Sequence, residues 1–432
     1  MRSLLVAVSI VVVVIGCAPR AIPRSPTPTA QPTRTAAPAP TAASPTADEI
    51  ERLQASIGLN PSDAEAHRDL GFALLQRVRE TADPALYARA DVAFERAREL
   101  DPDDALVLVG IGTLQLGRHE FAAALETARR AIDMAPRLAV ARAIEVDALV
   151  ELGRYDEADG AASEMLVLAS DLTTLSRVSY LAELRGELDV AVTAMRQATT
   201  SAGAAPENLA YTHVQLGNLL VHAGDPDGAT EAYERALELV PDHPPALAGQ
   251  GRLAVAASRL DDAITHFQAA ADLVPLPEYV IALADAQAAA GRADDAARSI
   301  ELARAEIQLF EATGVTVDLD QALFEADHGD PTRALAFAEA AYAEAPNIRA
   351  ADARAWALHR LGRDDEARGY ADEALRLGSR DPLLRFHAGA IAAALGDEAA
   401  ARRDLDLALS TDAGFSATHA AEARRLLESL GG

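Results

Sequence analysis

Apolar residues recur every three or four positions along most of the chain, which is the spacing of one face of an α-helix. Leu216 and Leu220 are one helical turn apart in one such segment, and Tyr233 and Leu237 are one turn apart in the next. Between these segments, residues 224–226 read Gly-Asp-Pro. Glycine can end a helix in the left-handed conformation, aspartate can cap the next helix, and proline suits its first position. The pattern predicts two antiparallel helices joined by a tight turn.

The helix-turn-helix pattern repeats along the chain with a period close to 34 residues. Four landmarks of one unit return 34 positions later in the next unit: Gly217 and Gly251, Ala229 and Ala263, Ala236 and Ala270, and Pro241 and Pro275. The turn itself, followed five residues later by alanine, is found at Gly153, Gly186, Gly224, Ser258, Gly291, Gly329, Gly362 and Gly396. About ten units cover roughly residues 60–413, and such a fixed period is typical of a stacked array.

The unit at residues 216–241 resembles a tetratricopeptide repeat (TPR). The resemblance implies an all-α, right-handed superhelical solenoid of about ten repeats over residues 48–415, whose concave face comes mainly from the first helix of each pair. Residues 416–432 are expected to form a capping helix over the last repeat. Two steps of 38 residues interrupt the period, and they predict either hinges or drift of the repeat sequence. The first unit has either about two extra helical turns or a longer loop.

The N-terminus has a distinct pattern of its own. A short charged end is followed by an apolar run at residues 4–15, which is too short to span a membrane comfortably, and then by Gly16 and Cys17. This arrangement resembles a bacterial lipoprotein signal. The resemblance implies that residues 1–16 are removed and that Cys17, the only cysteine, receives the acyl (palmitate-type) chains. The alternative is an ordinary secretory signal with an incidental cysteine.

Residues 17–47 are composed almost wholly of proline, threonine, alanine and serine after the cysteine. Such a segment cannot bury enough apolar surface to offset its ordering entropy, so we expect an extended tether. Its reach is at most on the order of 90 Å at about 3.1 Å per residue. The threonines and serines are either a plain spacer or acceptors of O-linked sugars.

Composition narrows the class of partner. Half of the residues are apolar and only 4% are aromatic, which favours helices with small contacts. The formal net charge is −27, and all 39 basic residues are arginine because the chain has no lysine. This balance argues against nucleic acid and anionic lipid headgroups as ligands, and it favours basic partners or cations.

Motifs for catalysis are missing from the sequence. The chain has no Gly-x-Ser-x-Gly elbow, no phosphate-binding loop, no dinucleotide-binding glycine pattern and no His-Glu-x-x-His pair. Two Asp-Pro-Asp segments lack the remaining ligands of a calcium loop. We therefore expect that the protein is not an enzyme and that it binds neither a cofactor nor a metal.

The resemblance to the TPR family places several side chains on the concave face. The candidates for groove binding are Tyr180, Tyr211, Asn218, Arg252, Asp285, Trp356 and His359. Trp356 is either a binding anchor or a packed residue between helices. Asn218 and Arg252 either hydrogen-bond a peptide backbone or carboxylate, or are solvated surface. The carboxylate clamp of some family members is not expected in its usual form, because Val214 stands where a basic residue would be needed.

These features together predict a membrane-anchored, extracytoplasmic scaffold that binds a protein or peptide. The processes in which such a scaffold would act are envelope assembly or secretion. The anchor would lie in the cell membrane or the outer membrane. The alternative is a lipoprotein that binds a peptide or small ligand, which would require a closed pocket near Tyr180 and Tyr211.

Overall fold

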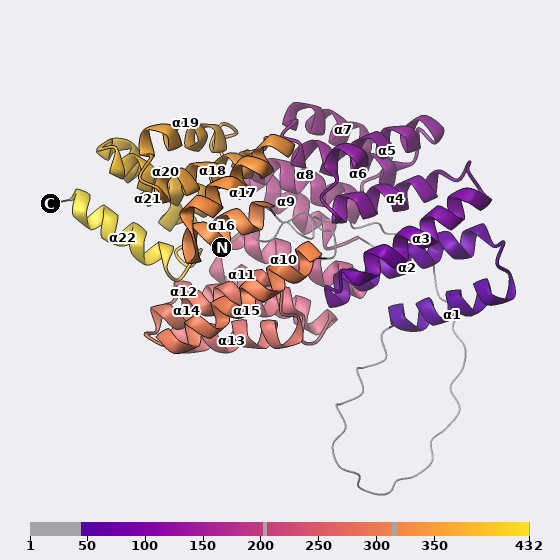
Figure 1. The fold of residues 1–432 in the computed structure, drawn as a ribbon, viewed down its shortest axis with the longest axis horizontal. Coiled ribbons are helices and arrows are strands. Elements are labelled where there is room, and N and C mark those ends of the chain that lie inside the picture. Colours follow the sequence, from indigo (N-terminus) through magenta and orange to yellow (C-terminus); the bar gives the residue numbers. More distant parts are fainter. Residues whose placement is uncertain (1–44, 202–204, 313–317, 432) are drawn as a thin grey trace, which may run out of the picture.

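The computed structural model describes residues 45–201, 205–312 and 318–431. Cys17 and the predicted signal lie outside these ranges. The described residues form helices and loops without a strand (Figure 1). The helices are α1 (Pro45–Leu59), α2 (Ala64–Thr81), α3 (Ala85–Leu100), α4 (Ala105–Gly117), α5 (Phe121–Met134), α6 (Ala139–Glu151), α7 (Tyr155–Leu168), α8 (Leu172–Leu184), α9 (Leu188–Ala198), α10 (Pro206–His222), α11 (Pro226–Leu239), α12 (Pro244–Ala256), α13 (Leu260–Leu273), α14 (Pro277–Ala289), α15 (Ala293–Ala312), α16 (Asp318–His328), α17 (Pro331–Glu344), α18 (Ile348–Arg360), α19 (Asp364–Ala374), α20 (Pro382–Ala394), α21 (Glu398–Thr411) and α22 (His419–Leu430).

Helices α2 to α21 pack as ten successive pairs, each even-numbered helix against the odd-numbered helix that follows it. Each pair also contacts the next, so that the pairs stack into a solenoid (Figure 1). The all-helical repeat array predicted from the sequence is thereby confirmed. None of the helices in the described ranges is both long and apolar enough to cross a bilayer.

The pair α10–α11 has the local chemistry that its sequence predicts. Gly224 ends α10 with a φ of +79°, and the Asp225 side chain accepts a hydrogen bond of 2.9 Å from the Gly228 N–H. Gly217 lies directly beneath Tyr233, since a Cβ added at Gly217 would be 2.5 Å from the tyrosine ring. A larger residue at position 217 would push the two helices apart.

The ends of the array differ in detail from the sequence-based boundaries. Helix α1 begins at Pro45, so residues 45–47 of the expected tether are helical, and Thr46 donates a hydrogen bond to Glu80 on α2. The extra length of the first unit lies in α2, which has 18 residues. At the C-terminus, α22 packs on α20 and α21 and buries Ala420 and Ala423.

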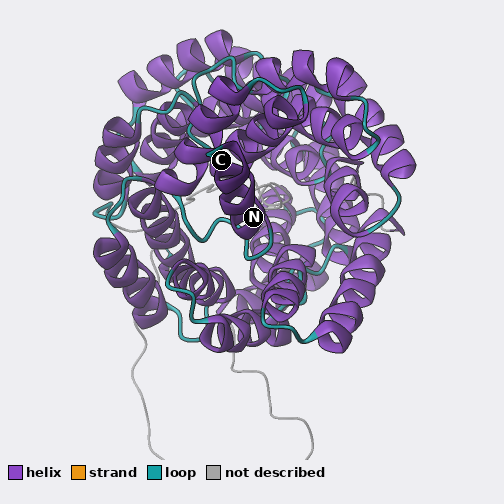
Figure 2. Ribbon diagram, turned by 90° about the vertical axis from the view of Figure 1, so that its left-hand side faces the viewer, coloured by secondary structure: helices purple, strands orange, loops and turns teal. Residues whose placement is uncertain are grey.

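The solenoid curves until its turns touch one another, and Figure 2 shows the helices arranged in a ring. At one such contact the Asn347 side chain donates a hydrogen bond of 2.7 Å to the Glu151 carbonyl, and the Ile348 N–H donates one of 3.0 Å to the Tyr155 hydroxyl. The partners are 196 and 193 residues apart in sequence. This place, between the α6–α7 turn and the start of α18, is called the turn-on-turn contact below.

Candidate functional site

A cavity with a volume of about 100 Å³ lies beside the turn-on-turn contact. Its lining comes from α6, α8, α10 and the first residue of α9 in one superhelical turn, and from residues 348–349 and 379–384 in the other. Tyr180 and Tyr211 both line it, so the two tyrosines proposed from the sequence share one pocket. We call this space the interior cavity.

One wall of the interior cavity contains a buried ion pair. Asp147 on α6 accepts a hydrogen bond of 2.5 Å from Arg177 on α8, and both side chains are almost completely buried. Arg177 also donates to the Ala143 and Thr173 carbonyls at 3.1 and 2.9 Å. Burial raises the pKa of Asp147 to about 7, although the charge of Arg177 opposes this shift. The ion pair therefore joins α6 to α8, the first helices of two successive repeats, at the wall of the cavity.

The remaining carboxylates of the cavity also have partners. Asp381 caps α20 by accepting from the Leu383 N–H at 2.9 Å. Glu183 lies 3.7 Å from the ring of His222. Tyr180 sits between acidic neighbours, and burial, with Glu151 nearby, holds the pKa of its hydroxyl well above the ordinary value. Tyr180 is therefore a neutral hydrogen-bonding group at any physiological pH.

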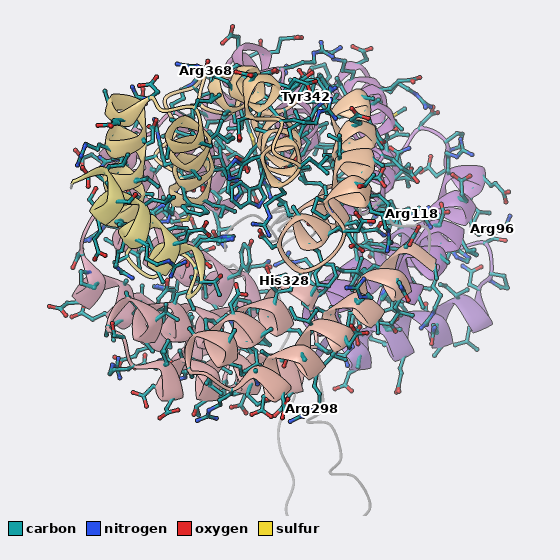
Figure 3. The ribbon with its side chains drawn as sticks, turned by 60° about the vertical axis from the view of Figure 1, so that its left-hand side comes forward. Arg96, Arg118, Arg298, His328, Tyr342 and Arg368 are labelled. Atoms are coloured by element: carbon teal, nitrogen blue, oxygen red, sulfur yellow. The ribbon has the colours of Figure 1, made fainter. Side chains whose placement is uncertain are left out.

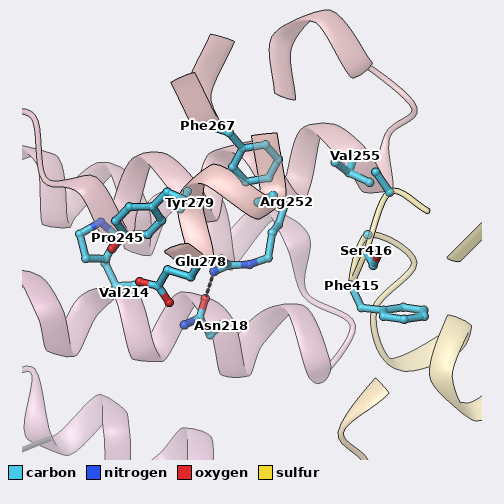
Figure 4. Close-up of a pocket in the computed structure, with 14 residues that line it drawn as sticks. Val214, Asn218, Pro245, Arg252, Val255, Phe267, Glu278, Tyr279, Phe415 and Ser416 are labelled. Carbon is cyan, nitrogen blue, oxygen red and sulfur yellow. Dashed lines mark hydrogen bonds between the residues drawn. The ribbon is translucent and has the colours of Figure 1, made fainter. Parts of the chain in front are cut away.

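Asn218 and Arg252 lie together, but not on open surface. Arg252 donates a hydrogen bond of 2.5 Å to the Asn218 side-chain oxygen (Figure 4). The same oxygen accepts a hydrogen bond of 2.8 Å from the Tyr233 hydroxyl. A loop at residues 414–417 lies over this pair and closes a second cavity of about 30 Å³. The pair is therefore not solvated surface, and hydrogen bonding of a peptide by Asn218 and Arg252 stays a prediction.

Burial also shifts the pKa of a carboxyl side chain in this second cavity. Glu278 lines it beside Arg252, and burial raises the pKa of its carboxyl to about 7. The Glu278 carboxyl in this cavity, which residues 414–417 also line, is therefore neutral below about pH 7.

Trp356 packs inside the protein rather than facing a groove, with 0% of its surface exposed. Its ring stacks on His387 with 4.1 Å between ring centres, and its N–H donates to Asp327 at 2.8 Å. His359 also stacks on Trp356, with 5.0 Å between ring centres, and pairs with Asp364 at 2.5 Å. The packing alternative therefore describes Trp356, because the first helix of this late repeat turns the indole toward α20.

Asp285 is buried 3.6 Å from the His328 ring, and burial raises the pKa of its carboxyl. Figure 3 places His328 on the inner side of the ring, whereas Arg298 and Arg368 project outward. The seven groove candidates thus divide among three places: the interior cavity, the second cavity and a buried aromatic and histidine cluster.

A third cavity, of about 50 Å³, adjoins the interior cavity through Glu151. Asp318, Asp320 and Glu344 line it, and sequence reasoning had singled out none of them. Burial raises the pKa of Asp320 to about 7 and also raises the pKa values of Asp318 and Glu344. Across the described ranges, no group of histidine, cysteine, aspartate or glutamate side chains has the geometry to hold a metal ion.

Two further residues of the interior cavity were missed by sequence reasoning. Gln215 follows Tyr211 by one helical turn on α10, so the helical period alone could have identified it. Arg380 lies in the turn before α20, and it reaches the cavity only because the two superhelical turns meet. No local signal in the sequence indicates that placement.

Comparisons with known proteins agree with the repeat architecture. The tetratricopeptide repeat family model matches residues 214–276 and 249–310. No curated protein sequence matches the chain significantly. The family indicated is one of helical repeats, and no enzyme family is indicated.

Several solved structures share some of the helical arrangement. A human IFIT1 dimer with PPP-AAAA has 17% identity, covers 77% of each chain and has a TM-score of 0.48. Yeast Tom70 has 15% identity over 85% of this chain and 95% of its own, with a TM-score of 0.32. Pseudomonas aeruginosa PilF has 18% identity over 48% of this chain and 96% of its own, with a TM-score of 0.39. The sequence match to this family covers residues 214–310, which lie within a longer series of helix pairs.

Proposed function

We propose that this protein is a membrane-anchored scaffold outside the cytoplasm, which binds an extended segment of a partner protein or peptide on the inner side of its superhelix. The interior cavity is the observation that carries the proposal. It places Tyr180 and Tyr211 beside polar groups from a second superhelical turn. Tetratricopeptide repeats typically bind protein or peptide segments, because stacked helix pairs present a long continuous surface.

We further propose that the partner is basic. The chain carries a formal charge of −27, so it attracts positively charged segments at low salt. In the third cavity, the side chains of Asp318, Asp320 and Glu344 form no hydrogen bond or ion pair with any described residue. A lysine or arginine side chain of the partner would supply the donors that these carboxylates lack.

The anchor is proposed at Cys17, from the sequence pattern alone. Several acyl chains on one residue would hold the protein firmly to a membrane, since each buried methylene contributes about 0.8 kcal/mol. Either the cell membrane or the outer membrane would then present the array on its outer side, in envelope assembly or secretion. Cys17→Ala protein should move from the detergent phase to the aqueous phase on detergent partitioning. A Cys17→Ala protein that stays in the detergent phase would rule out this anchor.

Partner binding is tested by crosslinking in cells followed by affinity purification of the intact protein. We expect a reproducible protein partner that is recovered with the wild type and depleted with Tyr211→Ala. Tyr370→Ala, which changes a tyrosine outside the three cavities, is the matched control and should retain the partner. Equal recovery with Tyr211→Ala would remove the interior cavity from the binding site.

A second candidate function is the binding of a peptide end or small ligand. The specific observation in its favour is the limited size of the interior cavity, about 100 Å³ between two superhelical turns. A reproducible absence of any protein partner, with a small molecule bound to the purified protein, would favour this function over the scaffold.

A further inference from the structure

The interior cavity contains hydrogen-bond donors that have no acceptor. Arg380 forms no hydrogen bond or ion pair with any described residue, and its Nε is buried. The Gln215 side-chain nitrogen is also buried without an acceptor. The Tyr180 hydroxyl, which lines the same cavity, donates to no group in the described part of the chain. Buried donors without acceptors are rare because they are costly to desolvate, so something that carries oxygen atoms is missing here.

The carboxylates of the cavity do not meet this need, because each is already engaged. Asp147 is held by Arg177, and Asp381 accepts from the backbone at the start of α20. Glu151 and Glu183 also have partners. A planar guanidinium binds a carboxylate through two parallel hydrogen bonds better than it binds other acceptors. The unpaired Arg380 therefore favours a ligand carboxylate.

The charge of the lining adds a second requirement. Four carboxyl side chains line the interior cavity. Arg177 offsets the charge of Asp147, so three carboxylates remain against two arginines, Arg349 and Arg380. A ligand that carried only a negative charge would be repelled by this surplus of carboxylates. A ligand that also carries an ammonium group is neutral overall and places its positive charge near Glu151 and Glu183.

The size of the cavity limits the ligand further. An engineered protein cavity of about 150 Å³ is known to admit benzene, which has six heavy atoms, so a cavity of about 100 Å³ admits a molecule of at most about six heavy atoms. Leu184, Leu188 and Leu384 supply an apolar part of the lining. A small α-amino acid, with its two charged groups and a short apolar side chain, meets all of these conditions.

We propose that the interior cavity binds a zwitterion, either a small free α-amino acid or the end of a very short peptide. Arg380, Gln215 and Tyr180 hold its carboxylate, and its ammonium lies toward Glu151 and Glu183. Arg380 belongs to one superhelical turn and the other two donors belong to another, so the bound ligand also bridges the turns. The proposal rests on the proposed function in its second form, the binding of a peptide end or small ligand in the interior cavity. A failure to bind L-alanine would leave the crosslinking test of a partner protein unaffected.

Isothermal titration calorimetry of the full-length protein with three probes of similar size tests the site. L-alanine has both charges, L-alaninamide lacks the carboxylate, and propionate lacks the ammonium. We expect L-alanine to bind at least about tenfold more tightly than either of the others. Equal affinities for L-alanine and L-alaninamide, or no binding of L-alanine to protein that melts normally, would overturn the proposal. Tetra-alanine with free ends distinguishes the sources, because only a peptide-end site binds it as well as L-alanine.

Variants assign the contacts. Arg380→Gln should weaken L-alanine binding by about 10-fold to 100-fold, and Tyr180→Phe, which keeps the packing of the ring, by several-fold. Arg368→Gln removes an exposed arginine that pairs with Asp397 outside the cavity, and it should leave binding unchanged. Thermal melts of each variant show that it is folded. Wild-type affinity in both Arg380→Gln and Tyr180→Phe would show that these groups do not hold the ligand.

Discussion

Replacing Gly153 by alanine should separate the superhelical turns at the turn-on-turn contact. Gly153 follows α6 with a φ of +71°, and a Cβ added there would lie 2.5 Å from the Pro346 carbonyl oxygen and 3.2 Å from the Asn347 Cα. Both of these atoms are backbone, so they cannot move aside as a side chain would. The new methyl group can be accommodated only if the two turns move apart.

The size of the effect has two parts. An alanine in the left-handed region costs about 1–2 kcal/mol wherever it occurs. Separation of the turns also breaks the hydrogen bonds of Asn347 to Glu151 and of Ile348 to Tyr155, each worth about 1 kcal/mol net and up to about 3 kcal/mol where a buried group is left unsatisfied. We therefore expect Gly153→Ala to lower the free energy of unfolding by at least about 3 kcal/mol, of which about 2 kcal/mol comes from the two hydrogen bonds.

Gly224→Ala is the matched control. Gly224 has a similar φ of +79° after α10, but a Cβ added there would meet no atom within 4 Å. It should cost only the conformational part, about 1–2 kcal/mol. Urea unfolding of the two variants gives the difference, and small-angle X-ray scattering should show a larger radius of gyration for Gly153→Ala alone. Equal destabilisation of the two variants, with equal radii, would refute the contact between turns.

Three further predictions concern the pH response, helix crossing and Trp356. Burial raises the pKa of Asp320 from 3.8 to about 7, so the folded state holds a proton that the unfolded chain loses. The free energy of unfolding should therefore fall by up to about 1.4 kcal/mol per pH unit as the pH rises from about 4 to 7. Asp320→Asn should weaken this dependence and be more stable than the wild type in urea at pH 8; an unchanged pH profile would contradict the assignment. Gly217→Ala should destabilise the protein by about 1–3 kcal/mol, because the new methyl group would meet the Tyr233 ring. Its control, Gly160→Ala, lies at a helical position where an added Cβ meets nothing within 4 Å, and it should stabilise the protein by up to about 1 kcal/mol. Thermal melts that gave the reverse order would contradict this prediction. Trp356, the only tryptophan, should resist quenching by acrylamide in the native protein; strong quenching would mean that the indole is not packed.

Local chemistry made the helix pairs predictable. Gly224 and Asp225 act within a few residues of their partners. Gly217 contacts Tyr233 between the two helices of a single pair. Such short-range rules operate whatever the rest of the chain does. The same reasoning identified the shared position of Asn218 and Arg252 in successive repeats, which the structure joins by a hydrogen bond.

Closure of the superhelix could not be predicted in the same way. It depends on small rotations between successive repeats, which add up over nearly 200 residues before Glu151 meets Asn347. Gly153, at the contact, has the same local sequence role as Gly224, where an added Cβ would meet no atom within 4 Å. The residues that complete the interior cavity from the second turn, such as Arg380, therefore had no signal of their own.

Burial also decided which groove candidates remain available. Tyr180 and Tyr211 reach a cavity, whereas Trp356 is fully enclosed and Asn218 is engaged by Arg252 and Tyr233. A helical period indicates which face of a helix a residue occupies, but it does not say whether a later repeat covers that face.

Site-specific photocrosslinking in cells tests the proposed interior binding site most directly. A photoreactive amino acid would replace Tyr180 in the interior cavity or, as the control, Val167, which is 86% exposed on α7 outside that cavity. The account predicts a discrete adduct with a partner protein or peptide from position 180 and none from position 167. Adducts from position 167 alone would contradict it, because the partner would then bind the outside of the array.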